Sequence, residues 1–315
     1  MRTDGLTNLR AAASALEGVA VRTPLVHAAD LSERLGVPVW LKCEQWQPVG
    51  AFKLRGAWTA ITRMPAERRA NGVIAYSSGN HGRAVAWVAR RLGLRAVIVM
   101  NDNAPPIKVE AVRAEGAEVL LVDRYVRQKT ADELAARERL AMVPPYEHDD
   151  VILGQGTCAL EILDDHPEIT ALLVPIGGGG LLAGSCLAAA ALNHPVELIG
   201  AEPEGAAKLS AALAAGAPTA LTGTASIADG LLPVAVGRLP WIQIGQRVHR
   251  AVRISEEALA ASVRYLFRDL GLKVEPSGAV AVAALLEGHV RPPGPVAAVL
   301  SGGNVDPDLF SKLTG

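Results

Sequence analysis

The stretch ALLVPIGGGGLLAG, residues 171–184, joins an apolar run to four consecutive glycines and a second apolar run. No charged residue occurs from Ala171 to Leu192, a length sufficient to cross a bilayer. Pro175 and the glycines argue against one continuous helix, because proline and glycine both disfavour a helix interior. The stretch therefore predicts a buried strand at 171–176, a tight turn and a buried helix at 181–192.

Strand patterns alternate with helix patterns along much of the chain. Residues 73–77 predict a strand and residues 81–93 a helix, and the same rhythm recurs up to a strand at 296–301. This alternation predicts an α/β fold with a mostly parallel sheet, in which ligands bind beyond the carboxyl ends of the strands. Three predicted strands end on polar or glycine-rich turns, namely SSGNHG at 77–82, GGGG at 177–180 and SGGN at 301–304.

The composition excludes several classes of protein. Half of the 315 residues are apolar and the net charge is −1, as expected for a globular chain without a basic surface for nucleic acid. The N-terminus has no secretory pattern and no segment reads as a membrane span, so we expect a cytoplasmic protein without membrane or nucleic-acid partners. The cysteines lie far apart and are expected to be buried thiols; they are Cys43, Cys158 and Cys186.

The four glycines predict an anion site. Bare glycines let the backbone approach a ligand, and N–H groups at a helix start bind phosphate. Gly178, Gly180 and Ala183 also satisfy the pattern GxGxxA, and Glu202 ends the next predicted strand. This spacing is close to a dinucleotide fingerprint, so a nicotinamide oxidoreductase is an alternative.

The other two turns carry hydroxyl and amide groups. In SSGNHG, the groups of Ser77, Ser78 and Asn80 precede a helix whose N-terminus could hold a carboxylate. The alternative is structural, with Ser78 or Asn80 as the N-cap of that helix. Ser301 at the start of SGGN is open to the same two interpretations, ligand contact or cap.

Lys53 is a rare lysine in a small-residue turn, QPVGAFKLRGA at residues 47–57. Only seven of the 31 basic residues are lysines. A free lysine amine has a pKa of about 10.4 and is a poor nucleophile at neutral pH. Desolvation beside Phe52 would lower the pKa of Lys53 and free its amine for Schiff-base chemistry.

These motifs, in this order, resemble the fold-type II pyridoxal 5'-phosphate enzymes, within them the serine/threonine dehydratase and serine racemase family. The segments GQGTCALEI (154–162), AEP (201–203), IADG (227–230) and EPSGA (275–279) add to the resemblance, which covers about residues 20–305. The resemblance implies two α/β domains, a large cofactor-binding domain of residues 1–65 and 150–315 and a small domain of residues 66–149. It also implies a homodimer.

The resemblance assigns a role to each motif. Lys53 would bind the cofactor as a Schiff base and act as the catalytic base, with Ser78 as a second catalytic group. Phe52, Asn80 and Ser301 would contact the cofactor ring. The phosphate would lie on Gly177, Gly178, Gly179 and Gly180. The substrate would be held by Ser77, Ser78, Gly79, Asn80, His81 and Tyr146.

The implied reaction is elimination of water from a β-hydroxy amino acid such as L-threonine or L-serine, giving a 2-oxo acid and ammonia. A serine at Ser301, unlike an aspartate, does not force the pyridine nitrogen to stay protonated, which suits elimination more than transamination. An amino-acid racemase is the alternative within the family, because Ser78 could serve as an acid/base on the face opposite Lys53.

The chain also departs from the family pattern. Val49 and Ala51 stand where hydroxyl residues are usual, and Arg83 and Tyr146 are unexpected near the substrate. The racemase group has a divalent-cation site formed by a glutamate, a carbonyl and an aspartate six residues later. Glu202 fits that pattern, but Lys208 replaces the aspartate, so we predict no metal site and an ion pair between Lys208 and Glu202.

Overall fold

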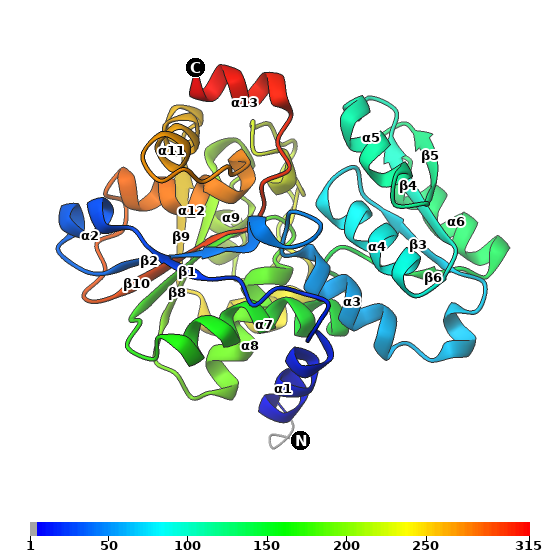
Figure 1. The fold of residues 1–315 in the computed structure, drawn as a ribbon, viewed down its shortest axis with the longest axis horizontal. Coiled ribbons are helices and arrows are strands. Elements are labelled where there is room, and N and C mark those ends of the chain that lie inside the picture. The colour runs from blue at the N-terminus through cyan, green and yellow to red at the C-terminus, as the bar shows by residue number, and fades with distance from the viewer. Residues whose placement is uncertain (1–4) are drawn as a thin grey trace.

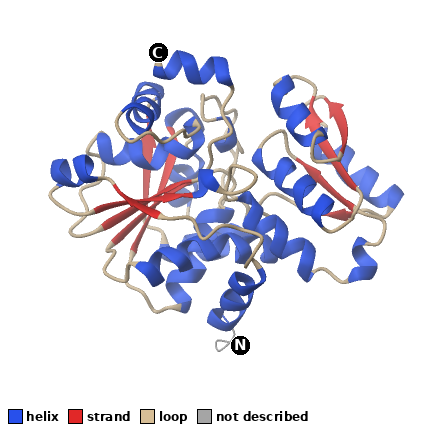
Figure 2. Cartoon of the chain, viewed as in Figure 1, coloured by secondary structure: helices blue, strands red, loops and turns tan. Residues whose placement is uncertain are grey.

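The computed structural model describes residues 5–315, which form two β-sheets covered by helices (Figure 1). Figure 2 shows the strands of each sheet enclosed by helices on both faces, which confirms the predicted α/β class. The six-stranded sheet has the order β1 (Leu25–His27), β2 (Val39–Cys43), β10 (Val296–Leu300), β7 (Ala171–Pro175), β8 (Glu197–Pro203) and β9 (Arg250–Ile254). The four-stranded sheet has the order β5 (Glu118–Val122), β4 (Ala96–Asn101), β3 (Val73–Tyr76) and β6 (Ala141–Met142).

Thirteen α-helices occur within residues 5–315. They are α1 (Gly5–Ala15), α2 (Ala29–Leu35), α3 (Lys53–Arg63), α4 (Asn80–Arg91), α5 (Pro106–Arg113), α6 (Arg127–Glu138), α7 (Asp149–Asp165), α8 (Gly180–Ala191), α9 (Lys208–Ala215), α10 (Arg238–Arg247), α11 (Glu256–Arg268), α12 (Pro276–Leu286) and α13 (Pro307–Thr314). Within these residues, no helix is both long enough and apolar enough to cross a bilayer. The strand at 171 and the helix after the glycines lie where the sequence predicts them.

The direction of the strands decides where the loops meet. Apart from the antiparallel pair β1–β2, all pairs in both sheets are parallel. Strand β10 lies directly beside β7, so the Ser301 loop and the four glycines emerge at the same edge. The loop after β3 leaves the carboxyl edge of the other sheet, and α3 lies between the two sheets in Figure 1.

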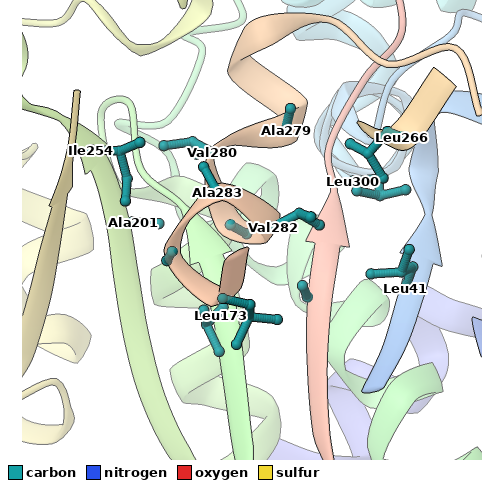
Figure 3. Packing of buried hydrophobic residues seen from close by; sticks show 14 of the residues in the cluster. Leu41, Leu173, Ala201, Ile254, Leu266, Ala279, Val280, Val282, Ala283 and Leu300 are labelled. Atoms are coloured by element: carbon teal, nitrogen blue, oxygen red, sulfur yellow. The ribbon is translucent and has the colours of Figure 1, made fainter. Parts of the chain in front are cut away.

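The larger core is built on both faces of the six-stranded sheet. Alternate residues of a strand face opposite sides. Leu173 and Leu300 therefore belong to the cluster under α11 and α12, whereas Leu172 packs with α7 and α8 on the other face. Figure 3 shows Val280 and Val282 of α12 among the strand side chains. The buried cysteines Cys43, Cys158 and Cys186 are free thiols within these packed layers, as predicted.

A separate core surrounds the four-stranded sheet. Val73 and Ala75 face α3 and α4, and Ile74 faces α6 on the other side. We propose that this sheet and its helices form the small domain of residues 66–149, and that the six-stranded sheet anchors the large domain. The two-residue strand β6 and the edge strands β1 and β9 lack a clear apolar alternation, and the sequence pattern does not predict them.

Candidate active site

Lys53 is the first residue of helix α3, so the predicted turn is wrong at this position. The helix forms because Leu54, Ala57 and Ile61 recur at helical spacing and pack into the core of the four-stranded sheet. The Lys53 side-chain nitrogen Nζ donates to the carbonyl of Pro145 at 2.9 Å. Burial lowers the pKa of Lys53 from its usual 10.5 to about 7, which leaves much of the amine uncharged at neutral pH.

The Lys53 segment is joined to the Ser301 loop by backbone contacts. The N–H of Phe52 donates to the Ser301 carbonyl at 3.1 Å, and Ala51 forms an isolated β-bridge with Gly302. The Phe52 ring centre lies 5.0 Å from Lys53 Nζ. Ser301 is buried at the carboxyl end of β10. The structure therefore brings Phe52, Lys53 and Ser301 together although Ser301 lies far along the chain.

The loop after β3 does not cap its helix with a side chain. The N-cap of α4 is Gly79, and no side chain forms a cap hydrogen bond there, so the capping alternative for Ser78 and Asn80 is wrong. The Ser77 hydroxyl accepts the Gly79 N–H at 3.3 Å, and the Ser78 hydroxyl accepts the Asn101 N–H at 2.8 Å. These contacts fix the two hydroxyls within the loop and leave the start of α4 without a side-chain cap, where helix N–H groups attract a carboxylate.

The His81 ring contacts the segment that follows β6. Its Nε2 lies 2.8 Å from the Val143 carbonyl, and the side chain is buried. Burial and the nearby charge of Lys53 lower the pKa of His81 to about 3, so the imidazole is neutral at neutral pH. Its Nε2–H donates the hydrogen bond to the Val143 carbonyl. The side chain of His81 thus connects α4 to the segment that precedes Tyr146.

The four glycines form a backbone cradle before α8. Gly179 adopts a left-handed φ of 99°, which side chains disfavour. A Cβ on Gly178 would overlap the ring of Tyr146, and one on Gly180 would overlap the amide of Gln155. In the described part of the chain, the N–H groups of these four glycines form no hydrogen bond. Unpaired N–H groups at the start of a 12-residue helix fit a phosphate.

Tyr146 closes one side of the cradle. Its ring lies against Gly178, and its neighbour Pro145 accepts the hydrogen bond from Lys53. Burial raises the pKa of the Tyr146 hydroxyl, so the phenol stays protonated at neutral pH. This position places Tyr146 between the lysine and the glycines.

Arg127 is a candidate site residue that the sequence analysis missed. It begins helix α6, where a positive charge opposes the helix dipole. Its Nη1 donates to Asn101 Oδ1 at 2.5 Å and to the Ser78 hydroxyl at 3.3 Å, and its buried Nε has no partner among residues 5–315. Burial lowers its pKa, and no carboxylate of the described chain forms an ion pair with it. The sequence feature that could have drawn attention to Arg127 is a basic residue at the start of a helix.

Glu275 is a second missed residue. It is the N-cap of α12, and its buried carboxyl accepts a 2.6 Å hydrogen bond from the amide of Asn80. Burial, together with the negative charge of Asp229, raises the pKa of Glu275 to about 8. The carboxyl is therefore mostly protonated at neutral pH. The EPSGA motif identified this segment but gave no reason to expect the Glu275 carboxyl beside Asn80.

Arg83 lies in the first turn of α4, next to the loop of residues 77–80. Its Nη1 donates to Asn304 Oδ1 at 3.1 Å. Gly79, Asn80, Arg83 and Asn304 line a cavity of about 170 Å³ that opens between α4 and the segment before α13. Asn304 also donates to Asn80 Oδ1, so Arg83 is connected through Asn304 to the first residue of α4.

The predicted ion pair between Lys208 and Glu202 is wrong, because each side chain binds other groups. Lys208 Nζ donates to the carbonyls of Ala206 and Leu231 at 2.8 and 2.7 Å. The Glu202 carboxylate instead accepts the N–H groups of Leu209 and Ser210, at the start of α9. Within residues 5–315, no group of three or more acidic, histidine or cysteine side chains could hold a metal. The residues present do not fit the divalent-cation site of the racemase group.

Lys53 is buried with a lowered pKa, and the Pro145–Tyr146 segment links it to the glycine cradle at the carboxyl edge of a parallel sheet. These features fit an enzyme that binds a phosphorylated aldehyde cofactor. Residues 16–302 match the sequence profile described as "Pyridoxal-phosphate dependent enzyme". The chain belongs to this family, and its cofactor is pyridoxal 5'-phosphate. The family match overturns the nicotinamide alternative.

The named proteins to which the chain is similar include lyases and a racemase. The chain is 38% identical to the L-threo-3-hydroxyaspartate ammonia-lyase of Saccharomyces cerevisiae, over 93% of this chain and 90% of that protein. It superimposes on a T.th. threonine deaminase with a TM-score of 0.90 and 37% identity, covering 95% of this chain and 98% of that one. Maize serine racemase gives a TM-score of 0.93 with 33% identity, covering 98% and 95%.

Proposed function

We propose that this protein is an ammonia-lyase for a β-hydroxy amino acid that carries a second carboxylate, such as L-threo-3-hydroxyaspartate. The observation that carries the proposal is Arg127, a half-buried guanidinium beside the Ser78 hydroxyl and without a carboxylate partner in the described chain. A desolvated cation is costly unless an anion pairs with it. A second carboxylate on the substrate supplies that anion.

The position of Arg127 also fits the geometry of such a substrate. We assign the α-carboxylate to the loop of Ser77 to Asn80 at the start of α4. The Ser78 hydroxyl is within 3.3 Å of Arg127 Nη1, so one substrate can reach both groups. Arginine binds a carboxylate through two parallel N–H groups, and its partner-free Nε is one of the donors left for this purpose.

Chemistry at Cα follows from the residues around Lys53. When bound, pyridoxal phosphate supplies an electron sink for the electrons left at Cα when its proton departs. Lys53, whose pKa is about 7, takes that proton as a base near neutral pH. Asn80, Ser301 and Phe52 orient the cofactor ring, and the four glycines hold its phosphate. Loss of the β-hydroxyl as water, followed by hydrolysis of the enamine, gives a 2-oxo acid and ammonia.

Substrate selectivity of the purified holoenzyme tests the proposal. We expect kcat/KM for L-threo-3-hydroxyaspartate to exceed kcat/KM for L-threonine and L-serine. Arg127→Gln should lower the first constant about 10- to 100-fold, because hydrogen bonds to charged groups contribute about 1.5–3 kcal/mol. The constants for threonine and serine should change little. Lys129→Gln removes an exposed charge from the same helix and serves as the control.

Two outcomes would overturn this substrate assignment. One is a wild-type preference for L-threonine that Arg127→Gln leaves unchanged. The other is appearance of the opposite enantiomer faster than release of 2-oxo acid, which would favour the racemase alternative and give Ser78 the role of second acid/base.

We also propose a cytoplasmic homodimer. Three buried, unpaired cysteines suit a reducing compartment. Val21 and Trp46 expose apolar side chains on two segments that the hydrogen bond from the Val21 N–H to Gln47 joins, and we infer that they offer a surface for a second copy. Light scattering of the purified protein would reveal a monomer if this assignment is wrong.

A further inference from the structure

Gln155 is a fully buried glutamine whose amide has no partner. It lies in α7, and its exposed fraction is 0%. Neither Oε1 nor Nε2 forms a hydrogen bond within residues 5–315. Burying an amide without hydrogen bonds costs free energy, and native proteins rarely tolerate it unless a ligand or water completes the contacts.

The amide is directed to the N-terminus of α8. The Cα–Cβ bond of a helical residue tilts toward the helix N-terminus, and a Cβ on Gly180, the first residue of α8, would overlap Gln155 Oε1. The stem of Gln155 packs on the other side against Gly56 of α3, where a Cβ would lie 3.0 Å from Gln155 Cγ. The amide thus lies between the helix that begins at Lys53 and the four glycines.

We propose that Gln155 donates a hydrogen bond to the cofactor phosphate and so completes the anion site formed by Gly177 to Gly180. The two ends of a glutamine amide have the same shape, so a half-turn presents Nε2–H in place of Oε1. The glycine N–H groups and the helix dipole attract the phosphate charge. Gln155 adds a side-chain donor whose direction is set by close packing against glycines on both sides.

This inference rests on the family's cofactor and is independent of the substrate assigned above. It concerns only the phosphate end of pyridoxal phosphate. Binding of pyridoxal, which has the same aldehyde and ring but no phosphate, must therefore be insensitive to the amide of Gln155. A residue that only supports the fold would affect both ligands alike.

The test compares the affinities of the apoenzyme for pyridoxal phosphate and for pyridoxal. In Gln155→Leu, we expect the dissociation constant for pyridoxal phosphate to rise about tenfold. The constant for pyridoxal should stay within twofold of wild type. In the same variant, inorganic phosphate should compete less well for the cofactor site. The ³¹P resonance of the bound cofactor should shift relative to wild type. Ser185→Ala, which removes a buried hydroxyl bonded to the Leu181 carbonyl within α8, is the matched control.

Equal losses for pyridoxal phosphate and pyridoxal, or no loss for either, would overturn the proposal. If Gln155→Leu does not fold, Gln155→Glu tests the proposal in its place. This variant keeps the side-chain shape and places a negative charge beside the phosphate. That variant should lose affinity for pyridoxal phosphate by more than tenfold and retain its affinity for pyridoxal. Unchanged affinity for pyridoxal phosphate in Gln155→Glu would show that the amide does not meet the phosphate.

Discussion

The side-chain amide of Asn80 donates a 2.6 Å hydrogen bond to Glu275 and accepts one of 2.7 Å from Asn304. Asn80 begins the helix after β3 of the four-stranded sheet, whereas Glu275 precedes α12, which packs on the six-stranded sheet. The orientation of the Asn80 amide is therefore set by residues from the far end of the chain. This contact joins the proposed substrate loop to the proposed cofactor-binding domain.

Replacing Glu275 by glutamine should change how the stability of the apoprotein depends on pH. The folded pKa of Glu275 is raised to about 8, so the folded state binds more protons than the unfolded state between pH 4.5 and 8. By linkage, the stability of wild type falls across this window as pH rises. Urea unfolding should show Glu275→Gln gaining stability relative to wild type from pH 5 to pH 9. Glu287→Gln, at the exposed end of α12, should show no such gain.

The lowered pKa of Lys53 predicts unusual reactivity of its amine. In the apoprotein, trace acetylation followed by mass spectrometry should give a labelling curve for Lys53 with a midpoint near its pKa of about 7. A lysine model peptide, with a pKa of about 10.4, provides the reference. A midpoint above 9 would mean that the Lys53 amine is hydrated and that burial does not control its charge.

Arg55 should be essential for stability. Two residues after Lys53, its fully buried guanidinium forms ion pairs with Glu44 at 2.8 Å and Glu161 at 2.7 Å. Arg55→Met leaves both carboxylates buried without that partner, so we expect a loss of about 3–5 kcal/mol in the free energy of unfolding. The arginine holds the pKa of Glu44 below its usual value. In Arg55→Met this effect is absent and burial favours the protonated form of Glu44, so the loss should shrink as pH falls and Glu44 of the variant takes up a proton.

Urea denaturation of the apoprotein at pH 7 and pH 4 measures both effects. Arg137→Met removes an exposed arginine and should cost less than about 0.5 kcal/mol. A cost for Arg55→Met as small as that of the control would contradict the assignment of a tightly coupled buried network.

Lys208 should make the enzyme independent of divalent cations. Its ammonium already binds the carbonyls of Ala206 and Leu231, so Mg²⁺ or a chelator should leave wild-type activity and thermal stability unchanged. Lys208→Asp replaces this cation by a carboxylate near Glu202, and its melting temperature should rise with added Mg²⁺ or Ca²⁺. Stimulation of wild type by Mg²⁺ that disappears in Glu202→Ala would contradict this prediction.

Local patterns were sufficient for the α/β class and for the three turns at strand ends. Apolar runs, glycines and prolines indicate which backbone conformation is favourable in free energy, and this preference depends on only a few neighbouring residues. The anion site at Gly177 to Gly180 and the reactive lysine followed from the same local chemistry. The position of Lys53 in a helix did not, because packing of Leu54 and Ile61 on a distant sheet outweighs the glycines around it.

By itself, the sequence determined the cofactor family and the order of its motifs along the chain. Only the tertiary structure decided which distant groups face them, because contacts such as Asn80 with Glu275 and Arg127 with Ser78 depend on sheet order and helix packing. The pKa values of Lys53 and Glu275 likewise depend on burial, and burial is decided by the residues that surround each group in the fold. For the same reason the substrate assignment rests on Arg127, an ordinary arginine in the sequence and a partly buried, carboxylate-free cation in the described fold.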